Sequence, residues 1–151
     1  MISIDVNNRQ ALLDIPERRL QDAVQAVLQG EGISAANISI AVVDDAAIHA
    51  LNHRYLQHDY PTDVLSFLLS DAGDVVDGEV VVSAETAERQ CGQFGWLAQD
   101  ELVLYIVHGV LHLVGYDDQQ PHEREVMRAR ERFYLNQMGS LPATDALQGD
   151  V

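Results

Sequence analysis

One apolar segment in the second half of the chain restricts the fold more than any other feature of the sequence. Residues 99–114 predict a helix whose side chains are apolar at most positions, so this helix must be buried among other elements. Two histidines, His108 and His112, interrupt the apolar run. Because they are four residues apart, they share one face of the helix, about 6 Å from each other. Two imidazoles so placed can bind one metal ion.

The remaining pattern supplies a small sheet and further helices. β-rich apolar runs bounded by turn residues predict strands at 1–6, 37–45, 64–69 and 78–83. Helical spacing and capping residues predict further helices at 16–29, after Asp44 or Asp45, from Ser83 to Gly95, and from Pro121 to about Met138. We expect Val126, Phe133 and Tyr134 to form the buried stripe of the last of these helices.

Length and composition favour one domain in a reducing compartment. A chain of 151 residues with 47% hydrophobic and 22% charged residues is typical of a domain with one core, which we place at 1–138, followed by a disordered tail at 139–151. The single cysteine, Cys91, excludes an internal disulfide and a multi-cysteine metal site. The amino-terminal residues do not resemble a signal peptide, and no window has the length of a membrane span. We therefore expect a soluble, cytoplasmic protein.

The charge balance opposes one class of function. With 24 acidic against 9 basic residues, the formal net charge is −15, which argues against a broad phosphate-binding surface. All nine basic residues are arginines, whose planar guanidinium groups suit phosphate, so a local basic groove is still compatible with the composition.

The turn after the histidine helix offers a third metal ligand. Gly115 ends the helix, and the following turn returns Asp117 and Asp118 toward the same end. A carboxylate with the two imidazoles would leave a fourth position for water, which is the arrangement of a catalytic zinc site. The alternative is that both histidines are core residues with one hydrogen bond each. Burying them unpaired would cost on the order of 1–3 kcal/mol each, and a shared metal avoids that cost.

A zinc peptidase helix has similar spacing but a different residue between its ligands. In the H-E-x-x-H pattern, the glutamate after the first histidine is the general base. Gly109 occupies that position here, so a peptidase of this type would lack its base.

The stretch HGVLHLVGYDD closely resembles the signature H-G-x-L-H-L-x-G-Y-D-H of the YbeY family of endoribonucleases. LNHRYLQHDYPTDVLSF, GEVVVSAETAERQ and then Glu123, Met127 and Glu131 follow the family's order, so the likeness covers about residues 35–135. The resemblance implies a single α+β domain with a small mixed four-stranded sheet and about five helices. It also implies a zinc ion on three side chains of the signature, in a single-strand-specific endoribonuclease that acts in 16S rRNA 3′ end maturation and ribosome quality control. The implied partners are ribosomal RNA, the small ribosomal subunit and an assembly GTPase.

The chain departs from the family pattern at two functional positions. The third ligand of the family is usually the histidine that ends the signature, and Asp118 stands there. We expect His108, His112 and Asp118 to bind the metal, with His122 as the rival third ligand. Asp117 is expected to hold the turn or to orient one of the ligands. The family also carries a functionally important arginine where this chain has Leu56, and Arg54 lies two positions away.

These residues leave the mechanism open. We expect metal-assisted cleavage of a phosphodiester, attacked by either water or the 2′-hydroxyl of the RNA. Arg54 and Ser66 are the candidate catalytic residues beyond the metal site, and Thr62 and Asp63 are candidates for lining the cleft. Two other functions remain open: a metal hydrolase acting on another substrate, and a ribosome-associated binding factor with structural zinc and little activity.

Overall fold

The computed structural model describes residues 1–70 and 73–139 of the chain. Along the chain it contains β1 (Ile2–Asn8), α1 (Glu17–Gly30), β2 (Ala36–Val43), α2 (Asp45–Leu56), β3 (Val64–Ser70), β4 (Val76–Ser83), α3 (Ala84–Gln90), the short 3-10 helix η1 (Cys91–Phe94), α4 (Ala98–Leu113) and α5 (Pro121–Gln137). Each strand and helix expected from the sequence is present. The tail expected at 139–151 lies outside the described residues apart from Gly139.

The four strands form a mixed sheet with the order β1-β2-β4-β3. The β1–β2 and β2–β4 pairs are parallel, whereas β3 and β4 are antiparallel. Helix α1 connects the first parallel pair, as a crossover between parallel strands requires. The expected α+β architecture with a small mixed sheet and five α-helices is therefore confirmed, and β3 forms one edge of the sheet.

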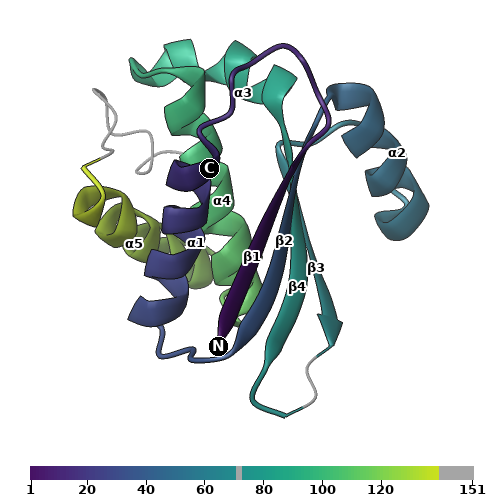
Figure 1. Ribbon diagram of the computed structural model, residues 1–151. Helices are drawn as coiled ribbons and strands as arrows, with labels where there is room; N and C mark the ends of the chain where they lie inside the picture. The colour runs from purple at the N-terminus through teal and green to yellow at the C-terminus, as the bar shows by residue number, and fades with distance from the viewer. Residues whose placement is uncertain (71–72, 140–151) are drawn as a thin grey trace.

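Helices cover both faces of the sheet. Figure 1 shows α1, α4 and α5 grouped on one side of the strands and α2 on the other. Alternate residues of the central strands divide accordingly: Ile40 and Val80 pack with the first group, whereas Ala41 and Val81 pack with Ile48 of α2. The carboxyl-terminal halves of β2 and β4 are apolar at successive positions because both of their faces are buried there.

Helix α4 lies unusually close to the sheet at the glycine between its two histidines. A Cβ atom at Gly109 would lie 2.5 Å from Val80 Cγ1 of β4 and 3.1 Å from Ser66 Oγ of β3. The Ser66 hydroxyl also donates a hydrogen bond of 2.9 Å to the Gly109 carbonyl oxygen. The position that carries a glutamate in zinc peptidases is therefore a packing position here, with no room for a longer side chain.

The expected buried stripe of α5 is wrong at two of its three residues. Tyr134 is fully buried, but Val126 is 41% exposed and Phe133 is 49% exposed. The helix instead buries the row formed by Met127, Glu131 and Leu135 together with Tyr134. A pattern of apolar residues does not predict this orientation, because the centre of the buried row is a glutamate that pairs with a histidine of α4.

No helix in the described part of the chain is both long enough and apolar enough to cross a membrane.

Candidate metal centre

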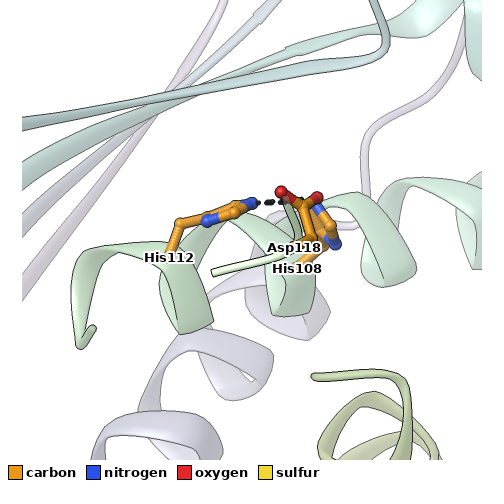
Figure 2. Close-up of side chains that lie close together, drawn as sticks. All are labelled: His108, His112 and Asp118. Atoms are coloured by element: carbon orange, nitrogen blue, oxygen red, sulfur yellow. Dashed lines mark hydrogen bonds and ion pairs between the residues drawn. The ribbon is translucent and has the colours of Figure 1, made fainter. Parts of the chain in front are cut away.

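Three side chains from the signature segment converge at one point beside α4 (Figure 2). The Nε2 atoms of His108 and His112 lie 3.1 Å apart. Asp118 Oδ2 lies 3.5 Å from His108 Nε2 and 3.4 Å from His112 Nε2. Among the described residues, this is the one group of three histidine, cysteine or acidic side chains whose ligand atoms all come within 4.8 Å of one another.

The turn after α4 brings Asp118 back to the histidines. Gly115 has a φ of 113°, a left-handed value that other residues rarely adopt, and it reverses the chain after the helix. The Tyr116 amide then donates to the Leu111 carbonyl oxygen at 3.0 Å. The Asp117 carboxylate accepts a hydrogen bond of 2.8 Å from the Asp118 amide, which supports the expectation that Asp117 holds the turn.

A buried carboxylate binds the ring nitrogen of His108 that points away from the cluster. His108 Nδ1 lies 2.6 Å from Glu131 Oε2 of α5, and the Glu131 side chain is only 2% exposed. Because an ionised carboxylate can only accept, Nδ1 carries the proton and the lone pair of Nε2 points toward Asp118. Carboxylates commonly orient metal-binding histidines in this way.

A backbone carbonyl group orients His112 in the same way, through its Nδ1 atom. His112 Nδ1 donates a hydrogen bond of 3.0 Å to the Tyr116 carbonyl oxygen, so its Nε2 also presents a lone pair to the cluster. Two lone pairs 3.1 Å apart, facing a carboxylate, repel one another unless a proton or a cation lies between them. The local hydrogen bonds thus favour a positively charged ligand at this point.

The spacing of the three atoms fits a tetrahedral metal ion. With ligands at about 2.0–2.2 Å from zinc, adjacent corners of a tetrahedron are about 3.4 Å apart. The three measured separations are 3.1, 3.4 and 3.5 Å. Two imidazole nitrogens, one carboxylate oxygen and one free corner also match the ligands of a catalytic zinc site.

The charges of the cluster shift the ionisation of two of its members. Hydrogen bonding to His108, together with the charges of both rings, lowers the pKa of Asp118 to about 2 although partial burial opposes this shift. Burial lowers the pKa of His108, but the neighbouring Asp118 and Glu131 carboxylates outweigh burial and raise it to about 9. Both shifts have the same physical meaning: the site stabilises positive charge next to two carboxylates.

The remaining candidates are not members of this group of three ligand atoms. His122 is an exposed residue in the first turn of α5, and the cluster found among the described residues does not include it. Arg54 and Leu56 lie near the end of α2, on the other face of the sheet from α4. Ser66 faces α4 but donates to the Gly109 carbonyl oxygen, and Asp63 accepts from the Val64 amide at 2.8 Å. Thr62 donates to Asp63 at 3.3 Å.

Two partners of the candidate metal-binding histidines were not anticipated from the sequence. Glu131 and the Tyr116 carbonyl group each bind one ring, so the cost of burying the two histidines without a partner does not arise. Glu131 is 23 residues from His108, and a single sequence gives no signal for this pairing. The Tyr116 contact uses a backbone atom, which no residue type reveals.

The fold and this cluster define a class: small α+β proteins with a helix-borne His-His-carboxylate centre suited to a divalent metal. The family model described as "Endoribonuclease YbeY" matches residues 5–139. The Endoribonuclease YbeY of Pelotomaculum thermopropionicum is 42% identical over 144 residues, which cover 88% of this chain and 95% of that protein. The Endoribonuclease YbeY of Carboxydothermus hydrogenoformans is 42% identical over 139 residues, which cover 89% and 96%. The chain belongs to the YbeY endoribonuclease family.

A solved structure supports the fold separately. The solution structure of TM1509 from Thermotoga maritima aligns with a TM-score of 0.61 over 100% of both chains, at 24% sequence identity. At that level of identity the match concerns the fold alone.

Proposed function

We propose that this protein is a zinc-dependent endoribonuclease that cleaves single-stranded RNA, with His108, His112 and Asp118 as the zinc ligands. The observation that carries this proposal is the triangle of possible ligand atoms from α4 and the turn after it, with edges of 3.1, 3.4 and 3.5 Å, in a member of a family of endoribonucleases. Zinc is the proposed metal because two imidazoles and one carboxylate are frequent ligands of catalytic zinc.

The protein's own residues prepare the site before substrate arrives. Glu131 and the Tyr116 carbonyl group fix both rings with Nε2 toward the metal position, which reduces the rearrangement needed to bind it. A bound divalent cation would supply Lewis acidity, either activating water or neutralising charge that develops on the phosphate. Asp118 adds a negative charge where the family usually has a neutral histidine, so we expect the site to hold the cation but to carry less net positive charge.

Exposed aromatic rings on α2 and just after it favour an unpaired RNA strand as the substrate. Tyr55 is 52% exposed and Tyr60 is 53% exposed, and the Arg54 guanidinium lies 5.2 Å from the centre of the Tyr55 ring. Aromatic rings with a nearby arginine bind single strands, because bases stack on the rings and the cation attracts phosphate. We assign Arg54 this binding role.

Strand β3 connects the aromatic surface to the metal centre. Phe67 faces α2, where its ring centre lies 5.6 Å from that of Tyr55. The preceding residue, Ser66, faces the opposite side and bonds to Gly109, the neighbour of His108. An RNA strand stacked on Tyr55 therefore reaches the metal centre by crossing the free edge of β3.

The biological substrate that we propose is ribosomal RNA in the cytoplasm. We infer a role in 16S rRNA 3′ end maturation and ribosome quality control, with the small ribosomal subunit and an assembly GTPase as partners. Family membership and the expected RNA chemistry support this assignment. Comparing rRNA 3′ ends in cells with and without the protein tests it: unprocessed 16S precursors in its absence are expected, and unchanged ends would contradict the role.

Leu56 at the family's arginine position favours one second candidate. Loss of that arginine would remove much of the catalysis, which is expected of a ribosome-associated binding factor with structural zinc and little turnover. Binding to ribosomal particles without cleavage of any RNA would support this candidate. The net charge of −15 instead favours a metal hydrolase that acts on another substrate.

Cleavage assays test the proposed activity. We expect the zinc-loaded protein to cut a single-stranded oligoribonucleotide, to leave the matching duplex and oligodeoxynucleotide intact, and to lose activity on chelation or in a His112→Ala variant. Activity on a small phosphoester or amide but not on RNA would support a metal hydrolase of another substrate instead.

Two matched variants test the aromatic surface. Tyr55→Ala removes the stacking ring of α2, whereas Phe133→Ala removes an equally exposed ring on α5 that also lies near an arginine, 4.6 Å from Arg130. Because one stacked base contributes about 1–3 kcal/mol, Tyr55→Ala should raise KM for single-stranded RNA by about 5-fold or more. Phe133→Ala should leave KM within about 2-fold, and equal effects of the two changes would contradict the assignment.

A further inference from the structure

We infer that Glu31, at the carboxyl end of α1, is a positioning residue of the metal centre that acts through Tyr116 on His112. The inference rests on the metal site proposed above and deepens it, because it names residues outside the cluster that set the affinity for the metal. Glu31 itself contacts none of the three proposed ligands in the described hydrogen bonds; its influence passes through one tyrosine.

Tyr116 is the link because its two ends have different partners. Its phenol donates a hydrogen bond of 2.9 Å to Glu31 Oε1. Its backbone carbonyl oxygen accepts the 3.0 Å hydrogen bond from His112 Nδ1. A change in the anchoring of the ring therefore moves the carbonyl oxygen that orients a proposed metal ligand.

The Glu31 carboxylate is itself firmly held. Its Oε2 atom accepts hydrogen bonds from Arg130 Nη2 at 2.7 Å and from the Tyr134 hydroxyl at 2.5 Å. The Glu31 side chain is 13% exposed, and Tyr134 is fully buried. The absence of a side chain at Gly30 makes this arrangement possible, since a Cβ there would collide with the Tyr134 ring and hydroxyl. Tyr116 is thus anchored to a rigid group and not to a freely moving surface carboxylate.

Both proposed histidine ligands are tied to the same turn of α5. Arg130 binds Glu31, and the next residue, Glu131, binds His108. The first connection reaches His112 through Glu31 and Tyr116, and the second reaches His108 directly. One helix thereby fixes the relative orientation of two rings whose Nε2 atoms must stay 3.1 Å apart.

A merely structural role for Glu31 makes a different prediction. If the hydrogen bonds only join α1 to α5, removing any of them should lower stability without changing metal affinity. Tyr134→Phe provides the matched control, because it removes one hydroxyl from the same carboxylate but leaves that carboxylate bound to Arg130 and to the Tyr116 hydroxyl. Tyr116→Phe removes the other hydroxyl and keeps the backbone carbonyl group that binds His112.

The experiment measures metal affinity in the full-length protein by competition with a chelator, using Zn²⁺, and records the absorption spectrum of the Co²⁺-substituted protein. For Tyr116→Phe and Glu31→Gln we expect affinity to fall by roughly 3- to 10-fold, less than the 10- to 100-fold typical for loss of a direct partner, with an altered Co²⁺ spectrum. The double variant should lose little more than either single variant, because both changes break one path. Tyr134→Phe should stay within about 2-fold of the wild type.

The outcomes separate this inference from the metal site itself. A Tyr116→Phe protein that binds zinc as tightly as the wild type, whatever its stability, would overturn the inference and leave the metal centre intact. An equal loss of affinity in Tyr134→Phe and Tyr116→Phe would also overturn it, since general loosening would then be the cause. A wild-type protein without zinc affinity would overturn the metal centre and the inference together.

Discussion

His108 and His112 each use one ring nitrogen for a protein partner and direct the other toward Asp118. The spacing of the two histidines and the carboxylate after Gly115 could be predicted from the sequence, because helix geometry and a glycine-terminated turn are local features. The sequence favours Asp118 over His122 as the third member, and the structure brings Asp118 to the cluster. Glu131 could not be predicted, because its contact with His108 depends on how α5 packs against α4.

Replacing Glu131 tests how much the orientation of His108 contributes to the affinity for zinc. Glu131→Gln keeps the size of the side chain but removes the charge that holds His108 Nδ1, so zinc affinity should fall by about 10- to 100-fold. Chelator competition measures the change. Glu125→Gln, the same substitution at an exposed position of the same helix, is the control and should have no effect. An unchanged affinity in the Glu131 variant would show that the contact is dispensable.

Gly109 is a packing position, and a single methyl group tests that statement. Gly109→Ala would place a Cβ 2.5 Å from Val80 Cγ1, so it should lower the free energy of unfolding by about 1–3 kcal/mol. Gly92→Ala is the matched control, because a Cβ at Gly92 would have nothing within 4 Å beyond its chain neighbours. Urea denaturation compares the two proteins, and equal stabilities would contradict the proposed close contact of α4 with β4.

At the scale of elements, α1, the turn after α4, and α5 meet at the Glu31 carboxylate. Burial raises the pKa of Glu31, but hydrogen bonds from Tyr134, Arg130 and Tyr116 outweigh burial and leave the pKa below its usual value. A carboxylate whose pKa is lower in the folded protein than in the unfolded chain stabilises the fold above the unfolded pKa. That contribution disappears as pH falls through the folded pKa.

The lowered pKa of Glu31 predicts how the stability of the protein depends on pH. The difference in unfolding free energy between the wild type and Glu31→Gln should be largest near pH 7 and should shrink as pH falls below about 4.3, the ordinary pKa of glutamate. Denaturation curves at several pH values measure the difference, with Glu125→Gln as an exposed control. A difference that stays constant from pH 7 to pH 3 would contradict the role assigned to the ionised carboxylate.

The elements themselves could be predicted better than their orientation. Strands and helices follow from apolar spacing and caps, such as Asp44 and Ser83, whose side chains accept from Ala47 and Thr86 amides. The buried face of α5 could not be read in this way, since Glu131 occupies the centre of that face. Contacts such as Glu31 with Tyr116 join residues 85 positions apart, and local sequence patterns carry no information on them.

At the scale of the whole molecule, the net charge of −15 opposes electrostatic binding to a polyanion such as RNA. On the proposed function, we expect its affinity for RNA to come mainly from base stacking and from the proposed metal centre, because few basic side chains are available to neutralise phosphates. For single strands, the logarithm of the binding constant falls by about 0.7 per phosphate contact for each unit in the logarithm of salt concentration.

The salt dependence of RNA binding is therefore expected to be shallow. With one or two arginine contacts, such as that of Arg54, the slope should lie between about −0.7 and −1.4. Fluorescence anisotropy with a non-cleavable 2′-O-methyl oligomer between about 50 and 200 mM salt gives this slope. A slope steeper than about −4 would reveal a broad basic surface and would contradict the charge argument.

The central claim is that His108, His112 and Asp118 together bind one catalytic metal ion, and the metal content of the purified, tag-free protein tests it most directly. Elemental analysis should find about one zinc per chain in the wild type and none in His108→Ala or Asp118→Ala. Zinc retained in Asp118→Ala but lost in His108→Ala would contradict the assignment of Asp118 and move the third ligand to His122 or water. No metal in the wild type would contradict the metal centre as a whole.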